Sequence, residues 1–461
     1  MLTDPSTLRP DDLVRDAPPP PLINNLGDLI SDSSPEPIRP RRYDLDALRG
    51  FAMLLGIVLH AAIPFMPYWQ DGDVGGGLLS GLFEFIHGFR MPLFFILSGY
   101  FTTMLWRGRG LEALIIHRLR RVALPLLIGL FTVLPAVWFG WGLGWAIYEA
   151  GIPDKAEVRV KEAIGVYDQK LAQSSETKEK QSYGDHPATR KPSVDENKES
   201  GDELDFAHMW FLWFLIWLVA GFSIIASLVT WIAIKLHRAR PVPSLVATLA
   251  LVTLPFLSVF PQVLMVEDVF GPDTSLSFLP NFIVLGYYGC FFGFGALAYD
   301  RQKKDGKALI DWVGKGWAGQ LLFASVVLFP VGRVLIDDAW FVSSLLQVTF
   351  AWAMSFGLIG LFLHFLSTPR FEVRWVSDAS YWMYLIHLPF IFLSQGIASH
   401  LPLNALVNFT LIVIAVTSVM LISYRYLVRY TLVGKLLNGS RTRLQDAAIR
   451  RDIGLTRPTK V

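Results

Sequence analysis

Arg49 and His60, in one apolar stretch, pair a basic group with an imidazole that accepts protons near neutral pH. They are eleven residues apart, which on a helix places both on one face, about 16 Å apart along the axis. Ionisable side chains are costly inside an apolar helix, so each of the two indicates a functional role. The alternatives are a histidine bonded to a neighbouring helix and an arginine that anchors the helix end at the membrane surface.

A second polar stripe lies in the next apolar stretch, where Glu84, His87 and Arg90 recur at every third position. Pro92 follows, and a proline there frees a backbone carbonyl one turn earlier. We expect His87 at a membrane depth similar to that of His60, where an ionisable group indicates a functional role. The alternative is a polar cluster in which Glu84 and Arg90 neutralise each other.

Arginines crowd the loop that we expect between the second and third helices. They are Arg107, Arg109, Arg118, Arg120 and Arg121. Arg118 and Arg121 share a helix face at a spacing of three, and guanidinium groups bind phosphate through paired hydrogen bonds. The alternative is a short cytoplasmic loop that is basic only because such loops set the topology.

A late apolar stretch opens with three residues of the kinds that cap helices. They are Ser377, Asp378 and Ser380. Tyr381, Tyr384 and His387 continue at a spacing of three, which predicts a stripe that faces other helices rather than lipid. Such a stripe fits either a functional site or hydrogen bonds between helices. We place His208 near the outer interface, where Trp210 fits an aromatic belt.

The composition indicates a membrane protein. The chain has 461 residues, of which 52% are hydrophobic and 17% charged, and its mean hydropathy is +0.42. Soluble domains carry about 25% charged residues. A net charge of +2 gives no case for nucleic acid as a partner. The single cysteine, Cys290, excludes a disulfide within the chain and a Cys₂His₂ zinc site, and no ligand set has metal spacing, so we expect no bound metal or cofactor.

Ten apolar stretches are long enough to cross a bilayer as helices. They are residues 47–68, 78–105, 122–148, 206–234, 243–264, 280–299, 316–336, 341–366, 378–395 and 404–427. The predicted fold class is all-α, a polytopic membrane helix bundle of about ten transmembrane helices. Glycines in the sixth stretch predict close helix packing. They are Gly286, Gly289, Gly293 and Gly295.

The short loops also predict an orientation. Basic stretches fall on one side of this map and acidic residues on the other, so the basic side and both termini are expected in the cytoplasm. Residues 1–40 read as a disordered cytoplasmic tail and residues 431–461 as a basic cytoplasmic tail. Residues 41–430 form the transmembrane domain, with a polar extracytoplasmic loop at about 151–205.

Ionisable residues inside an apolar bundle are costly, and they indicate a functional site. Histidines, arginines and a glutamate lie inside the predicted bundle, and a basic cluster lies at its cytoplasmic face. This combination fits two classes of protein. One is a proton-coupled transporter of a glycan or anion, and the other is a membrane-embedded transferase. Periodicity alone does not separate the two, although the lack of a visible internal repeat counts against a transporter.

Several motifs resemble the acyltransferase-3 family of membrane O-acyltransferases. Arg49 and His60 meet that family's Arg-x₁₀-His pattern, and Arg118 and Arg121 meet its Arg-x-x-Arg pattern. Three longer segments also resemble family segments: residues 43–50, 89–100 and 381–389. Residues 208–212, together with the inserted outer loop, resemble a subgroup described as succinylating periplasmic glucans.

The resemblance implies a multi-pass enzyme of the bacterial cytoplasmic (inner) membrane. It moves an acyl group, with succinyl as one candidate, from cytoplasmic acyl-CoA to a sugar hydroxyl of an extracytoplasmic glycan such as periplasmic glucan. Acyl-CoA is a co-substrate rather than a bound cofactor, and the expected partners are acyl-CoA, the glycan acceptor and the lipid bilayer.

The resemblance also implies roles for residues. Arg49, Arg118 and Arg121 would bind the donor. His60 would act as general base or transient acyl carrier, and His87 as a second proton acceptor. The supporting polar residues are Glu84, Arg90, Ser98, Tyr384 and His387. Two of these, the Ser98 and Tyr384 hydroxyls, would donate hydrogen bonds to the oxyanion.

Overall fold

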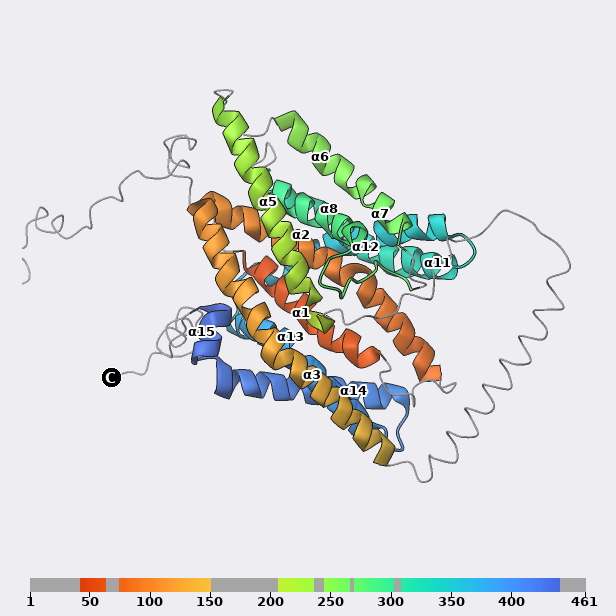
Figure 1. Ribbon diagram of the computed structural model, residues 1–461. Coiled ribbons are helices and arrows are strands. Elements are labelled where there is room, and N and C mark those ends of the chain that lie inside the picture. Colours follow the sequence, from red (N-terminus) through yellow and green to blue (C-terminus); the bar gives the residue numbers. More distant parts are fainter. Residues whose placement is uncertain are drawn as a thin grey trace, which may run out of the picture.

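The computed structural model describes residues 42–63, 74–150, 206–235, 244–265, 269–301 and 308–439, and within these ranges the chain folds into helices without strands (Figure 1). The predicted tail at 1–40 and the predicted outer loop at 151–205 lie outside the described residues, as does most of the predicted tail at 431–461. The all-α prediction is therefore confirmed for the part of the chain that is described.

The helices follow the apolar stretches of the sequence closely. They are α1 Tyr43–Ala62, α2 Val74–Arg118, α3 Leu124–Ala150, α5 Trp210–Lys235, α6 Ser244–Leu257, α7 Val259–Val263, α8 Phe282–Tyr299, α9 Leu309–Val313, α10 Trp317–Phe323, α11 Phe329–Val334, α12 Trp340–Leu366, α13 Phe371–Ala398, α14 Ala405–Ser423 and α15 Leu432–Asn438. Short π-helical turns continue three of them, at Leu119–Ala123, Ala324–Leu328 and Tyr424–Val428.

Eight helical segments of the described ranges are long and apolar enough to cross a membrane. This number treats Gly77–Ala150 as one segment, although the sequence predicts two spans there, and it leaves out α13, which carries the late polar stripe. Two of the predicted spans are interrupted, because α6 is followed by α7 and α10 by a π-helical turn and α11. The total of about ten spans and the orientation of the termini stay predictions.

The prediction of a loop at the arginine-rich segment is wrong. Helix α2 runs on to Arg118, and a π-helical turn leads directly into α3. The chain changes direction at Gly110, whose φ of +80° is a left-handed conformation that glycine adopts without a steric penalty. The basic residues of this segment therefore project from helices, which hold their guanidinium groups in defined directions.

The predicted helix caps of the late stripe are also wrong. Helix α13 begins at Phe371, so Ser377 and Ser380 lie inside it. The Ser377 hydroxyl donates to the backbone oxygen of Asp46 in α1 at 2.6 Å, and the Ser380 hydroxyl donates to the oxygen of Ser377 at 2.8 Å. Ser377 thus ties α13 to α1, and the Ser380 hydroxyl is satisfied within α13, so neither serine starts the helix.

Glycines allow some of the helices to cross at close distance. A methyl group on Gly99 of α2 would collide with the backbone oxygen of Phe292, and one on Gly295 of α8 with that of Ile96. The packing predicted for the sixth stretch is thus confirmed for Gly295, whereas Gly286 faces open space. The α2–α8 crossing fixes the helix that carries His87.

One end of the bundle gathers the basic residues, and we call it the basic end. Arg42, before α1, forms an ion pair with Asp311 of α9 at 2.6 Å. Arg107 of α2 pairs with Asp300 after α8, and Arg121 donates to the backbone oxygen of Leu437 in α15 at 3.1 Å. These contacts place stretches far apart in the sequence on the side predicted to face the cytoplasm.

Candidate active site

Four histidines line one cavity of about 430 Å³, which we call the histidine cavity. His60 comes from α1, His87 from α2, His208 from the turn before α5, and His387 from α13. A cavity of this size is typical of small-molecule sites. The structure therefore brings together the histidines of three separately predicted polar stripes.

His387 lies at the centre of this group. Its ring centroid is 5.2 Å from that of His60 and 5.1 Å from that of His208. Tyr384, which also lines the cavity, donates its hydroxyl hydrogen to the backbone oxygen of His208 at 2.8 Å. Among the described residues, no group of three or more His, Cys, Asp or Glu side chains is arranged to hold a metal ion.

The side chain of His208 is buried and lines the cavity, while its predicted depth near the outer interface stays a prediction. Helix periodicity could not find it, since His208 sits in the single 3₁₀ turn Ala207–Met209. The one available signal was the segment 208–212, which resembled a subgroup of the family.

Backbone carbonyls define which nitrogen of each ring carries hydrogen. His387 Nδ1 lies 2.8 Å from the oxygen of Tyr384 and 3.1 Å from that of Met383. A carbonyl oxygen only accepts, so Nδ1 is the donor and Nε2 keeps its lone pair. His208 is the reverse, with Nε2 donating to the oxygen of Leu385 at 2.9 Å. The remaining nitrogens, His387 Nε2 and His208 Nδ1, are buried with no hydrogen-bond partner in the described structure.

The same argument applies to His87, whereas the described part of the chain offers no such carbonyl partner to His60 Nδ1. His87 Nε2 donates to the backbone oxygen of Pro272 at 2.9 Å, and its ring stacks on Phe83 with centroids 5.4 Å apart. His60 Nδ1 is buried and has no partner among the described residues. The cavity thus offers several imidazole nitrogens that can accept a proton, as general-base chemistry requires.

Arg90 carries the only formal charge among the described residues that line the cavity, with the histidines neutral. Its proposed neutralisation by Glu84 is wrong, because Glu84 pairs instead with Arg333 of α11 at 2.7 Å. The Nε atom of Arg90 is buried without a hydrogen-bond partner in the described ranges, and Nη1 lies over Gly56 of α1. A positive charge held this way favours an anion in the cavity.

Ser98 is not one of the described residues that line the cavity. Its backbone oxygen accepts a hydrogen bond from Thr102 at 2.6 Å, and Thr102 in turn accepts one from Arg118 at 2.7 Å. Ser98 therefore lies on the path between the cavity and the basic end, while Tyr384 is the predicted hydroxyl that reaches the cavity.

The three predicted donor-binding arginines gather around one tyrosine of α13. Tyr381 donates its hydroxyl hydrogen to the backbone oxygen of Arg121 at 2.8 Å, and it lies within electrostatic reach of Arg49, Arg118 and Arg121. Arg49 also stacks over Phe101, 5.7 Å from the ring centroid. The guanidinium groups of Arg49 and Arg118 are near enough to repel each other, which phosphate binding would relieve.

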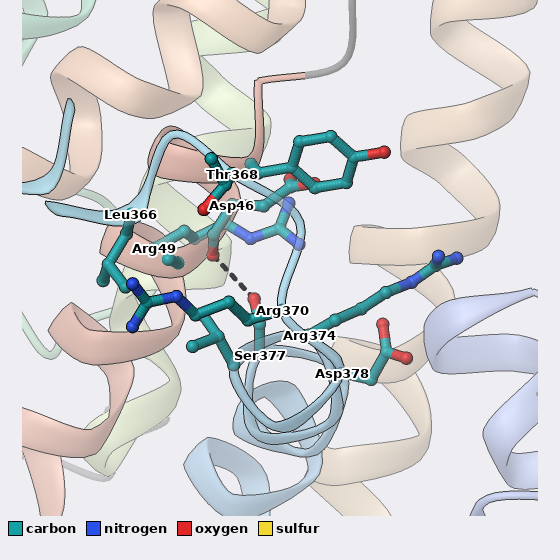
Figure 2. Close-up of a pocket in the computed structure, with 11 residues that line it drawn as sticks. Asp46, Arg49, Leu366, Thr368, Arg370, Arg374, Ser377 and Asp378 are labelled. Carbon is teal, nitrogen blue, oxygen red and sulfur yellow. Dashed lines mark hydrogen bonds between the residues drawn. The ribbon is translucent and has the colours of Figure 1, made fainter. Parts of the chain in front are cut away.

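A smaller pocket of about 30 Å³ opens beside this cluster at the basic end. Figure 2 shows Arg49 of α1 near Arg370 and Arg374 at the start of α13, with the hydrogen bond from Ser377 to Asp46 joining the two helices. In the sequence, Arg370 and Arg374 indicated only the orientation of the chain in the membrane. Both line this pocket, with Arg370 just before the first residue of α13 and Arg374 in its first turn.

Helices α1 and α13 connect the two regions. On α1, Arg49 faces the basic end and His60 the cavity, about 16 Å further along the axis. On α13, Tyr381 contacts the backbone of Arg121, and His387 lies in the cavity six residues further along the helix. A long, thin donor bound at its phosphates at one end could therefore present its reactive group to the histidines at the other.

Comparison with known proteins identifies the family of this chain. The family described as "Acyltransferase domain" matches residues 42–426. Relatives named "Glucans biosynthesis protein C" in Salmonella paratyphi B, Salmonella dublin and Salmonella enteritidis are each 26% identical over 412 residues, which cover 87% of this chain and 95% of the relative. No solved structure matches the chain. The chain belongs to the acyltransferase-3 family and is a membrane acyltransferase.

Proposed function

We propose that this enzyme takes an acyl group from acyl-CoA at the basic end and transfers it to a hydroxyl of an extracytoplasmic glycan, such as a periplasmic glucan. The observation that carries the proposal is the pair of sites on α1 and α13, with arginines at one end and the histidine cavity at the other. The name of the Salmonella relatives supports a glucan as acceptor.

The donor half of the proposal rests on charge. Arg49, Arg118 and Arg121 hold the phosphates of CoA, since guanidinium groups bind phosphate through paired hydrogen bonds. The positive-inside pattern predicts that this end faces the cytoplasm, where acyl-CoA is made. The pantetheine arm then follows α1 and α13 and delivers the thioester to the histidine cavity.

The transfer itself is an acyl substitution in which His60 acts as general base. His60 takes the proton of the sugar hydroxyl while the oxygen attacks the thioester carbon, the new C–O bond forms and the C–S bond breaks. The proton passes to the departing sulfur, so that CoA leaves as a free thiol. His387, whose ring is 5.2 Å from His60, is placed to share that proton during the transfer.

Arg90 supports succinyl as the acyl group. A succinyl chain ends in a carboxylate, and a buried guanidinium that Glu84 leaves unpaired is a suitable counter-ion for it.

Replacement of Arg90 by Gln should then lower kcat/KM for succinyl-CoA by about 10²-fold and change the value for acetyl-CoA much less. Equal losses with both donors would assign Arg90 to the oxyanion instead.

The experiment uses the purified full chain in lipid nanodiscs with acyl-CoA and a glucan oligosaccharide. We expect free CoA to appear only when the oligosaccharide is present, together with an acylated product in the mass spectrum. In proteoliposomes of the same protein, uptake of the oligosaccharide without any acylated product would support a transporter and refute the proposal.

A further inference from the structure

Four aromatic side chains of α3 form a row that begins in the wall of the histidine cavity. They are Trp138, Trp141, Trp145 and Tyr148, and we call them the α3 aromatic row. Successive ring centroids lie 6.4, 6.0 and 5.7 Å apart. Trp138 and Trp141 line the cavity. The row thus extends the cavity surface toward the end of α3 at Ala150.

The sequence of α3 explains why the row lies there. Spacings of three, four and three residues keep the aromatic side chains on one helix face. The neighbouring face carries Gly140 and Gly144, which pack against Pro389 and Phe392 of α13 so closely that a methyl group on either glycine would collide. This contact holds the row beside the helix that carries His387.

A membrane aromatic belt does not account for the row. Such belts gather at a single depth, the level of the lipid headgroups, whereas the row spans ten residues, or about 15 Å along the helix axis. The indole of Trp138 is 56% exposed and that of Trp141 is 40% exposed, although both face the cavity. Flat aromatic faces therefore continue from the reactive histidines to the predicted outer end.

We infer that the α3 aromatic row binds the glycan acceptor as a chain of several sugar units. The C–H face of a sugar ring packs on an indole or phenol face, and the polar edges of Trp and Tyr hydrogen-bond its hydroxyls. The row holds no charged side chain, which suits a neutral sugar. It places one unit beside His60 and lets the rest of the chain run along α3. The inference rests on the proposed function for the identity of the acceptor.

The test compares the binding of a glucan oligosaccharide with that of the matching monosaccharide. The purified full chain is used in nanodiscs without an acyl donor, and binding is measured by tryptophan fluorescence and by calorimetry. We expect the oligosaccharide to bind more tightly than the monosaccharide. Trp145→Ala should weaken oligosaccharide binding about tenfold and leave monosaccharide binding unchanged. Phe139→Ala, which removes an exposed aromatic ring from another face of the same helix, should change neither.

Two results would overturn the inference. One is equal binding of the oligosaccharide by the wild type and Trp145→Ala, which would assign the row to lipid. The other is equal affinity of the wild type for both sugars, which would remove the extended subsite. Because these readouts need no acyl transfer, length-dependent binding combined with an absence of acylated product would refute the proposed function while supporting the row.

Discussion

His60 is the residue on which the catalytic proposal depends most directly. It shares the cavity with three further histidines, and its ring centroid lies 5.2 Å from that of His387. A sugar hydroxyl must lose its proton during attack, and imidazole is the side chain best matched to accept it near neutral pH. We therefore expect that replacing His60 reduces acyl transfer.

His60→Ala should insert normally but lose acyl transfer by at least about 10²-fold, and His60→Gln should fare little better because an amide cannot cycle a proton. The measurement is acylated glucan per amount of membrane-inserted protein. His364→Ala is a control, because His364 packs on Trp317 outside the cavity. Near-normal activity of His60→Ala would move the base to His387 or His87.

Arg118 and Arg121 give a second prediction at the residue scale. Their joint replacement by Gln should weaken CoA binding by at least about tenfold and make the residual affinity less sensitive to salt. Calorimetry with CoA at two ionic strengths measures both effects. The matched control changes Arg109 and Arg120, which are exposed in the same segment, and removes the same charge. Unchanged affinity in the first variant would mean that this pair only anchors topology.

At the scale of elements, two helix crossings position the site. The glycines of α2 and α8 bring those backbones together, and the glycines of α3 do the same against α13. In a bilayer, helices associate mainly through such close van der Waals packing, because lipid offers no hydrophobic driving force between them. The crossings therefore determine where His87 and His387 stand relative to His60.

The α2–α8 crossing can be tested with two alanines on the same helix. Gly295→Ala places a methyl group against the backbone oxygen of Ile96 and should destabilise the protein by about 1–3 kcal/mol or more. Gly286→Ala faces open space and should leave stability unchanged or slightly raised. Thermal unfolding in detergent compares the two variants. Equal melting temperatures would show that this crossing does not limit stability.

At the scale of the whole molecule, the basic end and the cavity lie at different depths along α1 and α13. A donor from one compartment and an acceptor from the other can thus meet without either crossing the membrane. The arrangement requires that the basic end face the cytoplasm, which the charge pattern of the short loops predicts.

Reporter fusions test this orientation. A reporter after Val461 should behave as cytoplasmic, and one inserted near Ser182 should behave as exported, because short basic loops stay inside. The readouts are paired alkaline phosphatase and fluorescent-protein activities. An exported reporter at the C-terminus would reverse the map and place the arginine cluster on the wrong side for CoA.

Properties that depend on local pattern could be predicted without a structure. Apolar runs predicted an all-helical membrane bundle, and the spacing of Arg49 and His60 pointed to the family. The sequence also singled out His87 and His387, because an ionisable group in an apolar helix is conspicuous without any knowledge of its neighbours.

Tertiary structure alone decided which of these groups meet. Glu84 pairs with Arg333, 249 residues away, and the contact of Tyr384 with His208 spans 176 residues. Period and spacing describe one helix at a time, whereas these partners depend on which helices cross and how closely their glycines let them approach. For that reason the uncompensated charge of Arg90 and the fourth histidine of the cavity emerged only from the folded chain.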